Sequence, residues 1–186
     1  DNIPYPNLNQ PNSVENTMLG VLETQRGTAQ NDELLGSNSG NIWDARSGDD
    51  NLYGGDSGDI LNGNTGNDFI SGGSGDDILF GDENHDIILG NLGNDLIFGG
   101  KNNDSINCRE DNDIVYGNRN DDFIDGGKGN DTLFGGKGSD VVIGSEGEDS
   151  LFGSRGNDTI CGGADNDFIS GNEQSDVLTG CAGNDT

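Results

Sequence analysis

The aspartates of this 186-residue chain recur with a strict period of nine residues. Every ninth residue from position 32 to position 185 is Asp, and Asn41 is the one exception in the series. An apolar residue follows two places later throughout, from Leu34 and Trp43 to Leu178. Carboxylate oxygens delivered at a fixed interval are ligands for a hard cation, and flexible oxygen-only sites favour Ca²⁺ over Mg²⁺ or Zn²⁺. The spacing therefore predicts a series of calcium sites.

A nine-residue period without insertion or loss is typical of stacked identical units. The consensus reads Gly-Gly/Asn-x-Gly-Asn/Asp-Asp-x-apolar-x, as in residues 54–62 and 126–134. Seventeen full units begin at Gly27, and a partial unit begins at Gly180. We therefore predict a solenoid domain over residues 27–186. Residues 1–26, with three prolines and a short apolar run at Met18, Leu19, Val21 and Leu22, are predicted to be an extended segment that caps the solenoid or docks on a neighbour.

Each unit divides into a turn and a strand. Positions 2, 4 and 5 are rich in Gly, Asn and Asp, the residues that adopt positive φ at the lowest cost, so positions 1–6 are predicted to be a turn and positions 7–9 a very short strand. The apolar residue at position 8 then points inward, and positions 7 and 9 point outward. Two units form one 18-residue coil, which predicts an all-β parallel β-roll.

Aspartates 18 residues apart are expected to stack along each edge of such a roll, about 4.8 Å apart. A cation between successive turns would use two carboxylates and carbonyl oxygens of the glycine-rich loop. The two columns offer places for about fifteen ions, with a weaker site at Asn41. The predicted metal ligands are Asp32, Asp50, Asp59, Asp68, Asp77, Asp86, Asp95, Asp104, Asp113, Asp122, Asp131, Asp140, Asp149, Asp158, Asp167, Asp176 and Asp185.

Composition supports a metal-dependent fold. The formal net charge is -27 and only 28% of residues are hydrophobic, which on its own is typical of disordered chains. We therefore predict that the metal-free chain is largely unfolded and that calcium binding and folding are linked. Eight Lys and Arg against 35 acidic residues exclude nucleic acid as a partner, and no apolar run is long enough for a membrane span.

The units resemble the calcium-binding nonapeptide Gly-Gly-x-Gly-x-Asp-x-apolar-x of RTX (repeats-in-toxin) proteins over residues 27–186. This resemblance implies a parallel β-roll with calcium between its turns, the position-6 aspartates as ligands, and secretion from a bacterium with folding outside the cell. The chain departs from the pattern at Asn41, at Ala45 and Cys108 in position 1, and in position 4 at Gln30, Ser39, Ser57 and Gln174. Residues 27–44 resemble a degenerate end of the roll.

No catalytic constellation is visible, so we predict that the chain is not an enzyme. A zinc protease motif needs two histidines one helical turn apart, and the single histidine, His85, is predicted to be a solvated turn residue. No Gly-x-Ser-x-Gly elbow is present. Among the three cysteines, a bridge between Cys161 and Cys181 is geometrically marginal, and Cys108 is about four coils from Cys181.

One outward face carries aromatic residues every 18 positions. We predict a ladder with flanking apolar residues, a candidate interface made of Ile78, Phe80, Leu96, Phe98, Ile114, Tyr116, Phe134 and Phe152. The ladder either only stabilises neighbouring coils or forms a face covered by residues 1–26 or by another copy of the chain. Lys101, Arg119, Lys137 and Arg155 also recur at this spacing, as a solvated row or as a site for an anionic surface polysaccharide.

These observations favour a secreted structural protein of the cell surface. We predict a calcium-loaded rod that associates with copies of itself into an extracellular fibre or surface layer. Two alternatives remain open at this point. The first is a calcium-triggered folding module of a larger secreted RTX enzyme or toxin, which would supply a missing domain as partner. The second is an adhesin or glycan-binding module.

Overall fold

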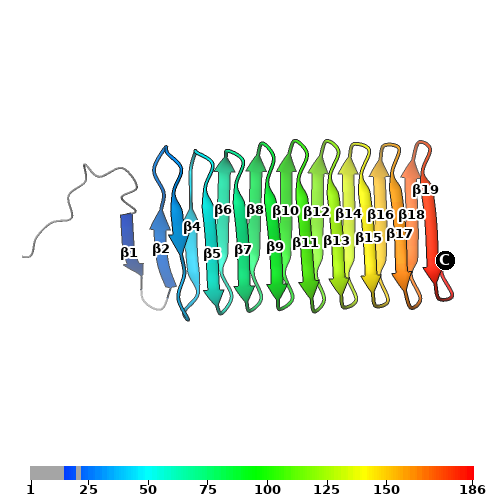
Figure 1. The fold of residues 1–186 in the computed structure, drawn as a ribbon, viewed down its shortest axis with the longest axis horizontal. Coiled ribbons are helices and arrows are strands. Elements are labelled where there is room, and N and C mark those ends of the chain that lie inside the picture. The colour runs from blue at the N-terminus through cyan, green and yellow to red at the C-terminus, as the bar shows by residue number, and fades with distance from the viewer. Residues whose placement is uncertain (1–14, 20–21) are drawn as a thin grey trace, which may run out of the picture.

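The structure is a computed structural model that describes residues 15–19 and 22–186, with side chains from residue 25 onward. Strands follow one another along a straight axis and form a long, flat rod (Figure 1). Part of the N-terminal segment predicted for residues 1–26, including Val21, lies outside the described residues. Within it, β1 (Glu15–Leu19) and β2 (Leu22–Arg26) pair antiparallel, and β2 pairs in parallel with β4.

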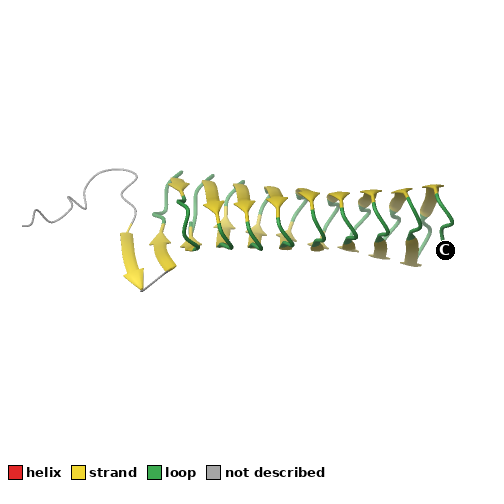
Figure 2. Ribbon diagram, turned by 90° about the horizontal axis from the view of Figure 1, so that it is seen from below, coloured by secondary structure: helices red, strands yellow, loops and turns green. Residues whose placement is uncertain are grey.

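The remaining strands alternate between two parallel sheets. Their bounds are β3 Glu33–Leu35, β4 Asn41–Asp44, β5 Asn51–Asp56, β6 Ile60–Thr65, β7 Phe69–Ser74, β8 Ile78–Glu83, β9 Ile87–Leu92, β10 Leu96–Lys101, β11 Ser105–Glu110, β12 Ile114–Arg119, β13 Phe123–Lys128, β14 Thr132–Lys137, β15 Val141–Glu146, β16 Ser150–Arg155, β17 Thr159–Ala164, β18 Phe168–Glu173 and β19 Val177–Ala182. One sheet holds β1, β2 and the even-numbered strands from β4 to β18, and the other holds the odd-numbered strands from β3 to β19. The two sheets lie as facing layers joined by short loops (Figure 2).

This arrangement is the all-β parallel β-roll that the period predicts. Paired residues differ by 18 in every parallel pair, as in Ile97 with Val115 and Ile106 with Ile124. Each 18-residue coil therefore contributes one strand to each sheet.

The predicted division of the unit is wrong in one respect, because the strands are longer than three residues. From β5 onward each strand has six residues and runs from position 7 of one unit to position 3 of the next, as Ile60–Thr65 does. The turn is thus reduced to positions 4–6. Position 1 becomes a second inward-facing position, buried at Gly63 in β6, and a residue without a Cβ leaves room there for another group.

Positive φ occurs at positions 2 and 4, for example at Gly55 and Ser57, but not at position 5 as predicted. Position 5 is rich in Asn and Asp for a different reason. Its side-chain oxygen accepts a hydrogen bond from the backbone N–H of position 5 in the next coil, as Asp76 does from Asn94 at 2.8 Å. Asn94 in turn accepts from Asn112 at 3.2 Å. This side-chain ladder satisfies loop donors that no strand partner reaches.

The core is a single file of position-8 side chains between the sheets. Every one from Leu34 to Ile160 is at most 1% exposed, as predicted. Ile169 is only partly buried, and Leu178 is 48% exposed because β19 packs against a coil on one side only. No helix long and apolar enough to cross a membrane occurs in the described part of the chain.

The structure changes the view of two cysteines. The Sγ atoms of Cys161, on β17, and Cys181, on β19, lie 2.8 Å apart, so the bridge judged geometrically marginal from sequence is within easy reach. Positive φ at Cys181 accompanies this approach across a diagonal of the sheet. Cys108 is fully buried and lies far from both along the roll.

We expect oxidised glutathione to link Cys161 and Cys181 in the folded chain by thiol–disulfide exchange, with two molecules of reduced glutathione released. Cys108 should stay reduced because it is inaccessible. Both cysteines lie in the tryptic peptide 156–186, so mass spectrometry under non-reducing conditions detects the link as the loss of two hydrogens from that peptide, and C181S serves as the control. Equal labelling of all three thiols after oxidation of the folded protein would contradict this expectation.

Candidate metal centre

The position-6 aspartates form two buried columns, one along each edge of the roll. Each lies directly before a strand, where the register places it next to the aspartate 18 residues on. From Asp50 onward, the backbone N–H of each donates to Oδ1 of the next in its column, at 2.7–3.1 Å. From Asp32 to Asp167 the residues of both columns are at most 3% exposed. The stacking predicted from the spacing is therefore present.

The second carboxylate oxygen has no hydrogen-bond donor. Oδ2 is buried and unpartnered in fourteen aspartates, namely Asp50, Asp59, Asp68, Asp77, Asp86, Asp95, Asp104, Asp113, Asp122, Asp131, Asp140, Asp149, Asp158 and Asp167. Buried carboxylate oxygens are strongly unfavourable unless a donor or a cation satisfies them. A cation, or at low pH a proton, is thus needed at a repeated place in the roll.

A glycine at position 1 makes room for this oxygen. A Cβ on Gly126 would lie less than 3.0 Å from both Oδ2 of Asp131 and the carbonyl oxygen of Gly144. The same crowding, by the carboxylate five residues on and the carbonyl one coil on, recurs at Gly54, Gly81 and Gly162. Two acceptors with no donor between them therefore meet above each of these glycines.

Asn41, the one exception in the aspartate series, supplies a hydrogen-bond donor that the other coils lack. Its amide Nδ2 donates to the carbonyl oxygen of Gly54 at 3.0 Å and to Oδ1 of Asp59 at 2.8 Å. In the other coils the Oδ2 atom of an aspartate occupies the place of the Asn41 Nδ2 atom. This Oδ2 lies near the carbonyl oxygen that corresponds to that of Gly54, and no hydrogen-bond donor lies between them. Since Asn41 satisfies these oxygens with N–H groups, a cation is what the aspartate-containing coils need.

The donor set fits Ca²⁺. It consists of a carboxylate oxygen, a main-chain carbonyl and the carboxylate of the next coil, all hard oxygen ligands. No group of three or more His, Cys, Asp or Glu side chains gathers within the described residues, so main-chain oxygens must complete any site. Bound calcium would supply positive charge between the coils, and the loop carbonyls would supply the remaining ligands.

Burial also raises the pKa of these carboxyl groups. Loss of solvation is the largest cause and the neighbouring aspartates of the column add to it, so that the pKa of Asp86, Asp113 and Asp122 rises to about 8. The pKa of Asp77, Asp104 and Asp149 rises to about 7; at Asp104 desolvation is the only cause that raises it. Burial therefore disfavours the charged carboxylate form in the metal-free roll, and a bound cation would stabilise that form.

The two ends of the columns differ from the middle. Oδ2 of Asp32 accepts hydrogen bonds from the backbone N–H and the hydroxyl of Thr28, at 2.6 and 3.0 Å. The first coil therefore satisfies its own carboxylate, in line with the degenerate character expected of residues 27–44. Asp176 and Asp185, near the other end, are only half-buried.

The substitution D131N tests whether an amide in the middle of the roll can make the hydrogen bonds that Asn41 makes. An amide at this position is expected to donate to the carbonyl of Gly144 and to Asp149, as Asn41 does to its own neighbours. The metal-free roll should gain about 1–3 kcal/mol of stability and the loaded roll should hold fewer calcium ions. Calorimetric calcium titration and the pH midpoint of metal-free unfolding measure the two effects.

Two further variants are the controls for D131N. D131A removes the charge without adding a donor, so it should lose calcium and should gain less metal-free stability than D131N does. D121N changes an exposed loop carboxylate and should alter neither quantity. If D131N and D131A behave alike, the hydrogen-bonding argument from Asn41 is wrong.

The aromatic residues predicted to stack do so on the sheet of even-numbered strands. Centroids of adjacent rings from Phe80 through Phe98, Tyr116 and Phe134 to Phe152 lie 4.8–5.3 Å apart, with planes within 10° of parallel. Phe168 continues the ladder with a tilted ring, 5.6 Å from Phe152. Spacing by 18 could not identify Phe168, because it occupies position 7 rather than position 9.

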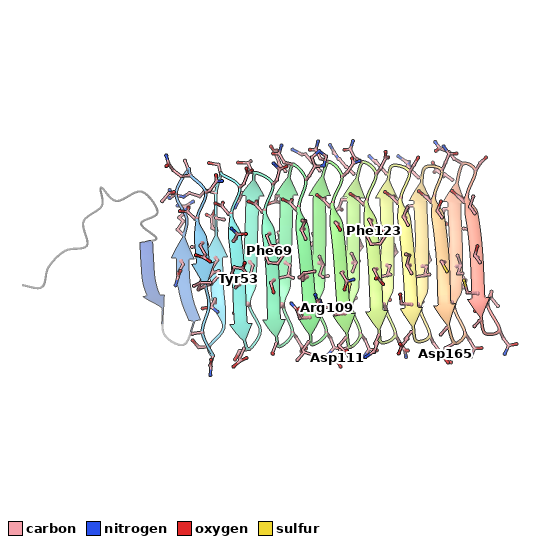
Figure 3. All side chains as sticks on the ribbon, in the orientation of Figure 1. Tyr53, Phe69, Arg109, Asp111, Phe123 and Asp165 are labelled. Atoms are coloured by element: carbon pink, nitrogen blue, oxygen red, sulfur yellow. The ribbon has the colours of Figure 1, made fainter. Side chains whose placement is uncertain are left out.

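The outer face of the other sheet carries fewer aromatic contacts, and Tyr53, Phe69 and Phe123 lie there (Figure 3). Asp111 and Asp165 lie in the turns along one long edge of the rod (Figure 3). His85 is exposed in a turn, as predicted, and its Nδ1 lies 3.1 Å from the backbone nitrogen of Asn103.

Comparison with known proteins agrees with the geometry. The family model of the RTX calcium-binding nonapeptide repeat (4 copies) matches residues 53–88, 80–107, 109–142, 134–169 and 158–186. Comparison with curated proteins gives no match. The matched residues cover most of the roll and include the buried, unpartnered carboxylates of its middle coils. The chain belongs to the family of RTX calcium-binding nonapeptide repeat proteins.

Proposed function

We propose that this chain is a secreted structural protein, a calcium-loaded β-roll that associates with copies of itself into an extracellular fibre or surface layer. The fourteen buried carboxylate oxygens without a donor carry the calcium part of the proposal. With about fifteen ions between the coils, the charge of -27 would be nearly cancelled. Extracellular calcium-binding modules work at about 10⁻⁴–10⁻³ M calcium, which suits a chain that folds after leaving the cell.

The outer face of the even-numbered sheet supports self-association. No residue at the outward positions 7 and 9 of β6, β8, β10, β12, β14, β16 and β18 is charged, although the chain is strongly acidic. Ile60, Ile114 and Phe168 on this face are 37%, 43% and 47% exposed. A flat, uncharged apolar face of this length is typical of a surface that another protein covers. Two such faces can pack about 10 Å apart, as sheets do in sandwiches.

Sedimentation velocity and light scattering in calcium test this proposal. We expect the wild-type chain to form large, concentration-dependent species in calcium, and the double variant F98S/F134S to remain much smaller because it interrupts the ladder. The matched control is F69S/F123S, which removes two rings from the opposite sheet and should assemble like wild type.

Two results would contradict self-association through this face. If the wild-type chain stays monomeric in calcium at every concentration, the protein binds calcium but does not self-associate. Equal assembly of the two double variants would show that the aromatic ladder is not the interface. Circular dichroism of each variant in calcium verifies that the roll is folded.

A further inference from the structure

Half of the eight basic residues of the chain form a single column. Lys101, Arg119, Lys137 and Arg155 lie at the ends of β10, β12, β14 and β16 and are direct neighbours in the sheet register. Glu83 precedes this column on β8 and Glu173 follows it on β18. Like charges placed directly opposite on adjacent strands repel each other, so such a column needs an explanation in an otherwise acidic protein.

The column is electrostatically incomplete at its centre. The outer members pair with the flanking acids, Lys101 with Glu83 at 2.5 Å and Arg155 with Glu173 at 3.3 Å. Among the described residues, no carboxylate oxygen lies within 4.0 Å of the charged nitrogens of Arg119 or Lys137. Asp121, which lines the loop side of these two residues, accepts a hydrogen bond from the backbone N–H of Ser139. Two adjacent cations therefore face solvent without a partner.

A groove separates this column from the aromatic ladder and runs along the rod. One hollow of about 340 Å³ is lined by Tyr116, Phe134, Lys137 and Arg155, with Asn118, Gly136 and Ser154 as its remaining lining. A second hollow of about 610 Å³ continues it along the column, past Arg119 and Lys101 to Glu83. The first hollow thus has an aromatic wall, a cationic wall and small or polar residues at position 2 between them, whereas the second hollow has no aromatic lining and reaches the carboxylates of Asp82 and Glu83.

The walls indicate the chemistry of the ligand. Because the rings of the ladder stack face to face, their faces cover one another and their edges remain for the groove. Ring edges carry the positive part of the aromatic quadrupole, so both walls favour oxygen-rich, anionic groups. The same combination repeats once per coil, about every 4.8 Å, so the fitting ligand is a linear polymer with one acidic group per repeat.

We propose that this groove binds an acidic polysaccharide with one carboxylate on each sugar ring. An extended acidic peptide fits less well, because side chains on one face of a strand repeat at about 6.6 Å rather than about 4.8 Å. Single-stranded nucleic acid binds by stacking bases on aromatic ring faces, which the ladder already covers. The hydroxyl of Ser154 and the side-chain oxygen of Asn118, whose Nδ2 donates to the carbonyl oxygen of Tyr116 at 3.1 Å, line the hollow and could bond to sugar hydroxyls. The site requires the folded roll and does not depend on self-association.

Titration of the calcium-folded chain with oligoglucuronate, at buffered free calcium, tests the proposal. We expect saturable binding in isothermal titration calorimetry, weakening as salt rises, and no binding of a neutral glucan of the same length. The double variant R119Q/K137Q should bind about ten-fold more weakly or worse, because it removes both unpaired cations. R109Q/K128Q, which removes the same charge from the opposite sheet, should bind like wild type.

Three outcomes would overturn the proposal. They are absence of saturable binding by the folded wild type, equal weakening of the two double variants, and equal or tighter binding of oligoaspartate or single-stranded DNA. Absence of saturable binding would mean that the groove is not a binding site. Equal weakening of the two double variants would mean that the attraction is non-specific, and equal or tighter binding of another polymer would mean that the groove binds that polymer instead. Circular dichroism and sedimentation on the same samples show separately whether calcium folding or self-association has failed.

Discussion

At about pH 8 without calcium the roll is expected to be unfolded, and lowering the pH to about 4 is expected to restore its strand content. Burial raises the pKa of eleven column aspartates to values of about 6 to 8, from 3.8 in the unfolded chain. They are Asp50, Asp68, Asp77, Asp86, Asp95, Asp104, Asp113, Asp122, Asp131, Asp140 and Asp149.

The direction of this pH dependence follows from proton linkage. Because the folded pKa values are raised, the folded state holds more protons than the unfolded state between about pH 4 and pH 8. The metal-free roll is therefore most stable below about pH 4 and loses stability as the pH rises through the folded pKa values. Calcium takes the place of these protons, so its apparent affinity should increase over the same range.

Far-UV circular dichroism of calcium-depleted protein against pH measures the effect, and fluorescence of the single Trp43, buried in the core, gives a second signal. Adding calcium at about pH 8 should restore both signals, whereas an equal concentration of Mg²⁺ should restore them far less, since Mg²⁺ dehydrates reluctantly. A metal-free chain with full strand signal at about pH 8 would refute the account of the columns given above.

Replacing an inward glycine in the middle of the roll, as in G126V, is expected to cost about 3 kcal/mol and to remove the adjacent calcium sites. The new side chain would enter the space occupied by Oδ2 of Asp131 and the carbonyl oxygen of Gly144. Ala45 and Cys108 occupy the same position in other coils, so a single Cβ can be accommodated by small shifts. A β-branched side chain adds two further carbons that no small shift can accommodate.

The neighbouring glycine provides a matched control for G126V. Gly127 has a φ of 96°, and Asn adopts positive φ at the equivalent position in Asn64 and Asn118. A Cβ on Gly127 would lie less than 3.0 Å from backbone atoms of Arg109, but the roll already accommodates adjacent side chains at this position where Asn91 pairs with Arg109. G127N should therefore fold with calcium nearly as wild type does, within about 1 kcal/mol. The calcium concentration at half-maximal folding, followed by circular dichroism, compares the two variants. Equal midpoints for G126V and G127N would show that the inward glycine does not shape the site.

The sequence alone was sufficient for the main features that depend on the period. An unbroken repeat of nine predicted the parallel roll, the inward file from Leu34 to Ile160, the two aspartate columns and the aromatic stacking of Phe80 with Phe98. These features follow because equivalent positions in a regular solenoid must meet their own copies 18 residues away. Oxygen chemistry then pointed to calcium, since only hard cations suit such a column.

The tertiary structure decided what depends on contacts between different positions of the unit. A three-residue strand was predicted because position 1 was assigned to the turn, yet position 1 faces inward so that the carboxylate of Asp131 can lie over Gly126. The ladder at position 5 is a separate case: it joins like positions, Asn94 with Asp76 and Asn112, but the composition of position 5 alone suggested positive φ rather than hydrogen bonds between coils.

Three further features also needed the path of the chain in space. They are the hydrogen bond from the Asn41 amide to the carbonyl oxygen of Gly54, the approach of Cys161 to Cys181 and the groove between the aromatic and basic columns. Each joins residues separated by 13, 20 or another interval that is not the coil length, or joins different positions of the unit. The period relates like positions to like positions only. How unlike positions meet is set by the strand length and backbone φ of each coil, which is why the structure was needed to find them.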